Sequence, residues 1–169
     1  MFNAARVNYV CLALVLGLCV RAAVADDAVR SPLQAFGGQR AADIVFSPDG
    51  GRLLVGYETS LVRVLDVESG QSEALFTAHS GPLHSVAFSP AGDEVLTTGQ
   101  NAQGQGELLR IDPETGDVVG SLAAGVSVND AAYFPDGARL LMGLHTSGSG
   151  PGGQGEAQVR DLDTGDLVQ

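Results

Sequence analysis

Three histidines are the side chains of this sequence best suited to bind a metal ion or to move a proton. His79 and His84 are five positions apart, and His145 is distant from both. Zinc sites on a helix pair two histidines four residues apart, and structural zinc sites group Cys and His closely. Neither pattern occurs here, and no carboxylate cluster accompanies the histidines. We therefore expect no metal site and assign His79 to structural hydrogen bonding at a chain reversal.

Glycines and carboxylates raise two further kinds of chemistry. Residues 150–155 match the Gly-x-Gly-x-x-Gly pattern of dinucleotide sites, which must join a strand to the start of a helix. Strands are expected on both sides of this segment, and Pro151 interrupts it. Acidic pairs such as Asp93-Glu94 stand beside turns, where they favour solubility and turn geometry. With no Gly-x-Ser-x-Gly elbow and no calcium-loop motif, we expect no catalytic residue and no cofactor.

The overall charge limits the kinds of partner. The chain has 20 acidic residues against nine basic ones, all of them Arg, and a formal net charge of −11. Such a chain repels phosphate backbones, which excludes nucleic acid as an expected partner. Apolar residues make up 44%, enough for a folded core, and the 23 glycines are roughly twice the usual share of ~7%. We expect a folded chain with many turns, whose partners are proteins.

The first 25 residues have the organisation of a targeting segment. An apolar run of 11 residues, 10–20, follows a short polar start that carries Arg6. The run is too short to span a hydrocarbon core as a helix, which needs about 20 residues, and it is typical of a secretory signal peptide. Ala23-Val24-Ala25 supplies the small residues of a cleavage site, so we predict cleavage before Asp26.

Both cysteines, Cys11 and Cys19, lie inside this segment. The mature chain is therefore expected to have no disulfide, no thiol nucleophile and no Cys-x-x-Cys-His haem attachment. These features predict an acidic exported protein of the bacterial periplasm or exterior, with no stable membrane anchor after cleavage.

A repeat organises the chain after residue 40. Prolines at 48, 90 and 135 each open a similar turn, and their spacings are 42 and 45 residues. In such a turn Pro presets φ at the second position, Asp caps locally and Gly accepts a positive φ. The residues assigned to these turns are Ser47, Pro48, Asp49, Gly50, Ser89, Pro90, Gly92, Pro135, Asp136 and Gly137.

A second turn with the pattern Asp-x-x-Ser/Thr-Gly follows each of the first ones. Its three copies run from Asp66 to Gly70, from Asp112 to Gly116 and from Asp161 to Gly165. Short apolar runs lie between all these turns, and such runs predict antiparallel strands. We expect strands at 44–46, 53–55, 61–65, 74–76, 86–88, 95–96, 108–111, 118–119, 132–133, 140–142, 157–159 and 167–169. The fold class expected is all-β.

Four short strands in a unit of about 42 residues are typical of a β-propeller blade. The stretch 76–90 resembles the WD-repeat propeller family, whose Gly-His dipeptide corresponds to Ala78-His79. The family's Trp-Asp dipeptide corresponds to Leu65-Asp66, Ile111-Asp112 and Arg160-Asp161. All three dipeptides keep the family's Asp, and none of them has the Trp.

The resemblance also implies a gap in a hydrogen-bond network. Thr59 stands where the family has an Asp before the third strand. We therefore expect the family's buried His–Ser/Thr–Asp–Trp network to be incomplete. The resemblance implies a fold and carries no specific activity.

The predicted organisation is a signal peptide (1–25), a lead segment (26–40) with an outer strand at 32–36, and a propeller segment (41–169) whose blades span about 41–80, 81–124 and 125–169. Propellers close with about four to eight blades, so the ring is incomplete. We expect the chain to be the N-terminal piece of a longer protein. The competing idea is that copies associate through their open blade edges.

Two inserted loops are the candidate partner-binding segments. They lie between the second and third strands of the last two repeats, at 99–106 and 145–155, and in a meander they share a face with the connections between blades. The candidates are Gln100, Asn101, Gln103, Gln105, His145, Thr146, Ser147, Ser149 and Gln154. The alternative is that these loops are flexible spacers without a role.

The function expected is that of an exported protein-interaction scaffold without chemistry of its own. A second hypothesis makes the chain the N-terminal propeller of a larger periplasmic enzyme or of a cytochrome-like or quinoprotein-like redox protein. A third, a lactonase-like or quinoprotein-like propeller with a central active site, expects inward His, Glu or Asp residues, and the three repeats show no repeating set of them.

Overall fold

The computed structural model describes residues 9–13, 19–23, 39–123, 127–146 and 154–168. The regular elements of this part of the chain are all β-strands, which confirms the all-β class. In the first unit, Met1–Gln34, strands β1 (Tyr9–Ala13) and β2 (Cys19–Ala23) pair as an antiparallel hairpin. No helix long and apolar enough to cross a membrane occurs among the described residues. Export through a signal peptide stays a prediction.

The second unit, Ala35–Gln169, contains three antiparallel sheets. In each one the strands lie side by side in chain order, so every sheet is a meander. The first sheet has β3 (Ala41–Phe46), β4 (Arg52–Tyr57), β5 (Leu61–Asp66) and β6 (Ser72–Thr77). The second has β7 (Leu83–Phe88), β8 (Val95–Gln100), β9 (Gly106–Ile111) and β10 (Val118–Ala123), and the third β11 (Ser127–Tyr133), β12 (Arg139–Thr146) and β13 (Gln154–Asp161).

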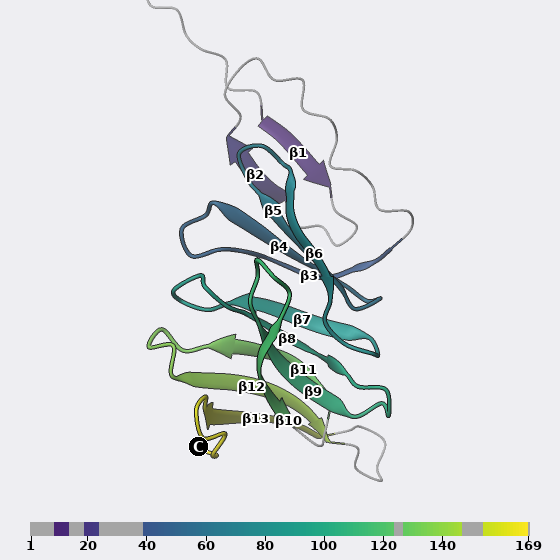
Figure 1. Cartoon of the computed structure of the whole chain (residues 1–169), viewed down its shortest axis with the longest axis vertical. Helices are drawn as coiled ribbons and strands as arrows, with labels where there is room; N and C mark the ends of the chain where they lie inside the picture. The colour runs from purple at the N-terminus through teal and green to yellow at the C-terminus, as the bar shows by residue number, and fades with distance from the viewer. Residues whose placement is uncertain (1–8, 14–18, 24–38, 124–126, 147–153, 169) are drawn as a thin grey trace, which may run out of the picture. The chain divides into compact units, whose positions relative to one another are not determined.

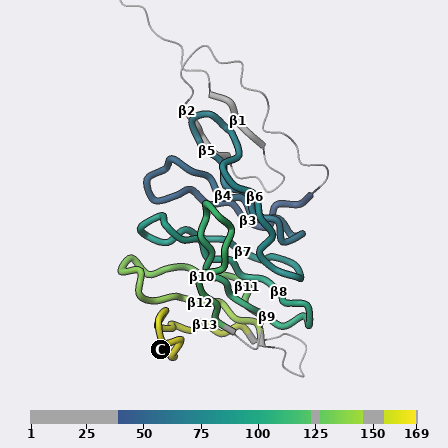
Figure 2. The backbone as a smooth tube through the Cα atoms, in the orientation of Figure 1, coloured from purple at the N-terminus to yellow at the C-terminus, as the bar shows by residue number. Residues whose placement is uncertain are grey.

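The three sheets follow one another in the order of the chain (Figure 1). Strand β7 packs beside both β3 and β11, so the first strands of the three sheets are neighbours. The turns that join the first and second strands of the sheets lie one below another, coloured blue, teal and light green in Figure 2. Successive four- and three-stranded meanders with adjacent first strands are consistent with the blades of an incomplete propeller.

The third sheet differs from the four-stranded unit expected from the repeat. Leu167 forms a single antiparallel bridge with Arg160, and Val168 N donates to Val159 O at 2.8 Å. The described part of the expected strand 167–169 therefore pairs with β13 through this bridge and this hydrogen bond. Gln169 and the outer strand expected at 32–36 lie outside the described residues.

The strands are longer than the apolar runs that predicted them. Strand β8 was expected at residues 95–96 but continues to Gln100 through Thr97 and Thr98, which are both 0% exposed. Backbone pairing with β7 and β9 carries the strand through these polar residues. A prediction from the hydrophobic pattern alone ends a strand too early where buried residues with hydroxyl groups continue the strand.

The core lies between the sheets and follows the two-residue period of strands. Neighbouring residues of β8 point to opposite sides, so that Val95 packs against the first sheet and Leu96 against the third. The first interface contains Leu54, Val62, Val64, Leu83, Val86, Phe88, Val95, Leu109 and Ile111. The second contains Leu96, Leu108, Val128, Ala131, Leu140, Met142, Leu144 and Leu162. The middle sheet is thus covered on both faces.

Candidate functional site

The Pro-containing turns use their polar groups to hold their own shape. Ser47 Oγ donates to Asp49 Oδ1 at 2.6 Å and accepts from Arg52 N at 2.8 Å, while Gly50 has a φ of +74°. In the second sheet Ser89 Oγ donates to Asp93 Oδ1 at 2.8 Å. Pro48, Pro90, Gly92, Pro135, Asp136 and Gly137 lie in the same three turns. These residues shape the backbone.

The Asp-x-x-Ser/Thr-Gly turns are built in the same way. Asp66 Oδ1 accepts from Ser69 N at 2.7 Å, Asp112 Oδ1 from Glu114 N at 2.8 Å, and Asp161 Oδ1 from Thr164 N at 2.9 Å. Hydrogen bonds from the turn lower the pKa of Asp66 and of Asp161, as Ser47 and Arg139 do for Asp49 and Asp136. Gly70, Gly116 and Gly165 close these turns at positive φ. In all three turns the Asp carboxylate is an acceptor occupied by backbone N–H groups of the turn.

The connection between the first and second sheets places a histidine in the core. His79 is 4% exposed, its Nδ1 lies 2.9 Å from Glu107 Oε1, and its Nε2 lies 3.0 Å from Thr97 Oγ1. A carboxylate oxygen accepts hydrogen bonds, so we assign the ring proton to Nδ1, and the Thr97 hydroxyl then donates to Nε2. Burial lowers the pKa of His79, and the bond to Glu107 opposes that shift. His79 is a neutral structural residue.

Glu107 was not among the residues selected from the sequence. The network was expected to lack its carboxylate, but Glu107 supplies one from within β9, opposite Gly99 on β8. A Cβ on Gly99 would lie 2.6 Å from His79 Cδ2, so the glycine leaves the space that the ring occupies. The sequence shows only a glycine two residues after Thr97, and the pairing of that glycine with Glu107 comes from the register of β8 and β9.

The loop between β8 and β9 is closed by hydrogen bonds from Asn101. Its Oδ1 accepts from Gln103 N at 3.0 Å and Gln105 N at 2.9 Å, and its backbone N donates to Gln105 O at 2.9 Å. Gly104 takes the positive φ, +74°, that the turn requires. Gln103 and Gln105 are exposed, and Gln100 is half-buried. These hydrogen bonds close the loop on itself.

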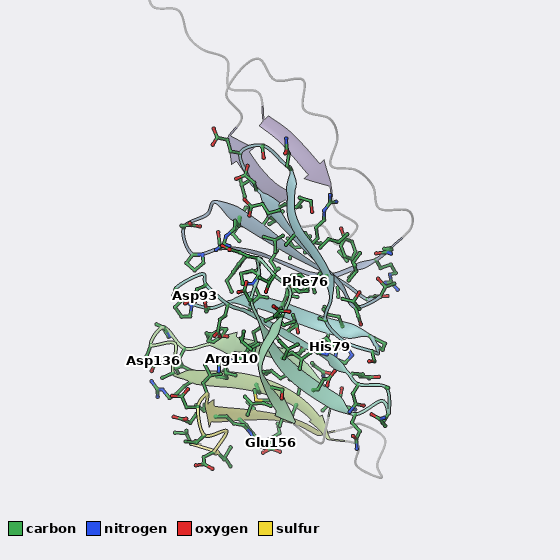
Figure 3. The ribbon with its side chains drawn as sticks, viewed as in Figure 1. Phe76, His79, Asp93, Arg110, Asp136 and Glu156 are labelled. Atoms are coloured by element: carbon green, nitrogen blue, oxygen red, sulfur yellow. The ribbon has the colours of Figure 1, made fainter. Side chains whose placement is uncertain are left out.

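This loop and the connection between the first two sheets share a face, as predicted from the meander. Gly81 N donates to Gln100 O at 2.8 Å, and Gln100 N donates to Pro82 O at 3.0 Å. A Cβ on Gly81 would lie 2.9 Å from Gln100 Cβ, which shows how closely the two segments pack. His79 lies on this side of the sheets, away from Asp93 and Asp136 of the Pro-containing turns (Figure 3).

A shallow depression of about 600 Å³ opens beside these loops. Residues of all three sheets and their connections line it: Ala42, Glu58, Thr59, Pro82, Leu83, His84 and Asn129. His84 Nδ1 lies 2.9 Å from Val128 O and so links the second sheet to the third. Glu58 pairs with Arg40 at 3.7 Å. The depression and the Asn101 loop together form what we call the loop face.

The candidate residues of the third sheet are only partly described. His145 is exposed in β12, Thr146 ends that strand and Gln154 begins β13. Ser147 and Ser149 lie outside the described residues. Within the described ranges, no three His, Cys, Asp or Glu side chains are grouped so as to hold a metal ion.

Comparison with known proteins finds a partial similarity. No protein-family model matches the chain. The chain is similar to the angio-associated migratory cell protein of the dog, Canis lupus familiaris, a WD-repeat protein, with 36% identity over 76 residues. The match covers 43% of this chain and 17% of that protein. The similarity and the successive antiparallel sheets support WD-like blades.

Proposed function

We propose that this chain is a protein-interaction scaffold whose docking surface is the loop face. The observation that carries the proposal is the Asn101 loop, which hydrogen bonds close on itself beside a depression that all three sheets line. A loop fixed before binding loses little conformational entropy when a partner docks, so more of the contact energy becomes affinity. The similarity to a WD-repeat protein supports the same function.

The chemistry of the face indicates the kind of partner. Gln103 and Gln105 are exposed amides that offer both donors and acceptors, while the exposed Pro82 gives the lining of the depression an apolar side chain. The formal net charge of −11 favours a partner protein with a basic surface, because complementary charge speeds encounter and suppresses wrong partners.

We also infer that the chain is exported and cleaved before Asp26.

The experiment compares two faces of one protein. A double variant, Gln103→Ala with Gln105→Ala, removes the loop amides and the long 3.3 Å bond from Asn101 Nδ2 to Gln105 Oε1. It keeps Gly104 and both backbone N–H bonds to Asn101 Oδ1, which close the turn. The matched control is Glu68→Ala with Glu114→Ala, two exposed residues of the turns on the opposite face. Each variant and the wild type are used as bait, and the proteins that they capture are quantified by mass spectrometry. The mass of the recovered bait chain also reports the cleavage site.

We expect the loop variant to lose specific partners and the control to retain them. A truncated polar hot spot costs about 2 kcal/mol, which lowers occupancy about 30-fold when both proteins are present well below the Kd. If both variants capture the same proteins in the same amounts, the loop face is not the docking surface and the proposal fails.

A further inference from the structure

One face of the third sheet is exposed where the same face of the first two sheets is buried. Leu54, Leu96 and Leu141 occupy the same place in the repeat, six residues after the turn proline. They are 0%, 1% and 44% exposed. In the first two sheets the next sheet covers this leucine, and no described residue covers it in the third. Register places Ala132 and Val159 beside Leu141 in an apolar row.

The first sheet is open on its opposite face. Phe46 and Phe88 occupy the same place, two residues before the turn proline, and are 39% and 8% exposed. Leu53 is half-buried, whereas Val95 and Leu140, which are equivalent to it, are both 0% exposed. The open row of the first sheet therefore consists of apolar residues like those of the equivalent rows in the second and third sheets, which a preceding sheet buries.

These two open rows are the two halves of an interface that the chain already makes twice. The row of Leu54 packs against the row of Phe88, and the row of Leu96 packs against the row of Leu140. The row of Leu141 is the third-sheet equivalent of the rows of Leu54 and Leu96. The row of Phe46 is the first-sheet equivalent of the rows of Phe88 and Leu140. We propose that a second copy of this chain docks head to tail, its first sheet on the third sheet of its partner copy.

Such a contact is heterologous, and two of them close a ring of six sheets between two copies. A heterologous interface forms a ring when its rotation closes and an open filament when it does not. Six sheets lie within the range of about four to eight in which propellers close. The rotation from the third sheet to the next is set by the same kind of interface as the two rotations within the chain, which favours closure.

The repeat also predicts which polar contact forms across the new interface. Within the chain, the Arg52 guanidinium lies 5.4 Å from the centroid of the Phe88 ring and donates to Gly92 O. Arg139 is the equivalent of Arg52, Phe46 of Phe88, and Gly50 of Gly92. In the single chain Arg139 donates to Asp136 and lies 4.5 Å from the centroid of the Phe134 ring. In the dimer we expect it to exchange these contacts for the Phe46 ring and Gly50 O of the second copy.

The experiment uses the whole chain and measures its mass in solution by light scattering after gel filtration. Leu141→Asp places a charge on the open row of the third sheet, and Phe46→Asp does so on the open row of the first. Val119→Asp is the matched control, because Val119 is 52% exposed in the outer strand β10, away from both rows. Circular dichroism and urea unfolding establish that each variant is folded.

We expect the wild type and Val119→Asp to have twice the mass of the 17.3 kDa chain, less any residues that processing removes. Each contact that carries Leu141→Asp or Phe46→Asp should form about 30-fold more weakly, the loss typical of a hot-spot substitution. Both contacts of a homodimer carry the substitution, so the dimer of either variant should be weakened about 1,000-fold. A mixture of the two variants should recover dimers, because one of the two contacts then joins unaltered rows. An isologous dimer would not behave in this way.

A folded wild-type chain that stays monomeric overturns the proposal. So does a dimer that both Asp variants leave intact. A larger, open assembly of the wild type would show that the contact forms but does not close, and this overturns the ring of six sheets.

Discussion

The hydrogen bond between Thr97 and His79 offers a sharp test of how the first two sheets are joined. Thr97→Val removes the hydroxyl group that donates to His79 Nε2 at 3.0 Å and replaces it with a methyl group of similar size. Thr97 is 0% exposed and His79 is 4% exposed, so no water reaches the nitrogen that is left. The substitution isolates the hydrogen bond from the packing around it.

The magnitude follows from two opposing contributions. An unpaired buried acceptor costs about 2 kcal/mol, within a range of about 1–3 kcal/mol. The added methyl group returns about 0.8 kcal/mol of hydrophobic stabilisation. The free energy of unfolding should therefore fall by about 1 kcal/mol, and Tm by about 4 °C for a domain of this size.

The decisive assay repeats Thr97→Val in a His79→Leu background, with urea unfolding of all four proteins at one concentration. Without the ring nitrogen the Thr97 hydroxyl has lost its acceptor, so replacing it with a methyl group should raise stability. The two effects of Thr97→Val should differ by about 2 kcal/mol, which is their coupling energy. If Thr97→Val has the same sign and size in both backgrounds, the network does not stabilise the fold and the reasoning is refuted.

Two further predictions concern glycines and pH. Gly116 and Gly104 have φ of +78° and +74°, but only a Cβ on Gly116 meets another residue, 2.8 Å from Phe76 Cβ. In urea unfolding, Gly104→Ala should cost about 1 kcal/mol for strain and Gly116→Ala about 1–3 kcal/mol more for overpacking, and equal costs would contradict this. The pKa of His79 is lowered from 6.5, so the unfolded state binds a proton that the folded state does not, and stability falls as pH drops through 6.5. Urea midpoints at about pH 7.5 and 5.5 should therefore differ more for the wild type than for His79→Gln, and an unchanged difference would show that His79 is not the group.

Much of the fold was predictable because its turns are chemically explicit. Pro48, Pro90 and Pro135 mark one reversal in each unit, and the second turn of each unit begins at an Asp that accepts backbone hydrogen bonds. Such turns depend on a few neighbouring residues, so they can be recognised locally. The all-β class and the meander order follow from these turns and from the short apolar runs between them.

The candidate site was less predictable because its parts meet from different strands. Asn101 and its loop were selected for their length and polarity, but the hydrogen bonds that hold the loop are seen only in the structure. Glu107 was missed altogether, because its role depends on the register between β8 and β9 and on the space beside Gly99. Neither the register nor that space is visible in a run of residue types.

The sequence by itself determined the local units: their turns, their period and the apolar residues of each strand. The tertiary structure alone decided what those units do for one another. Leu54, Leu96 and Leu141 are the same residue at the same place in three repeats, yet two are buried and one is 44% exposed. Burial is a property of the neighbouring sheet and not of the residue, because an apolar side chain leaves water only when another surface covers it.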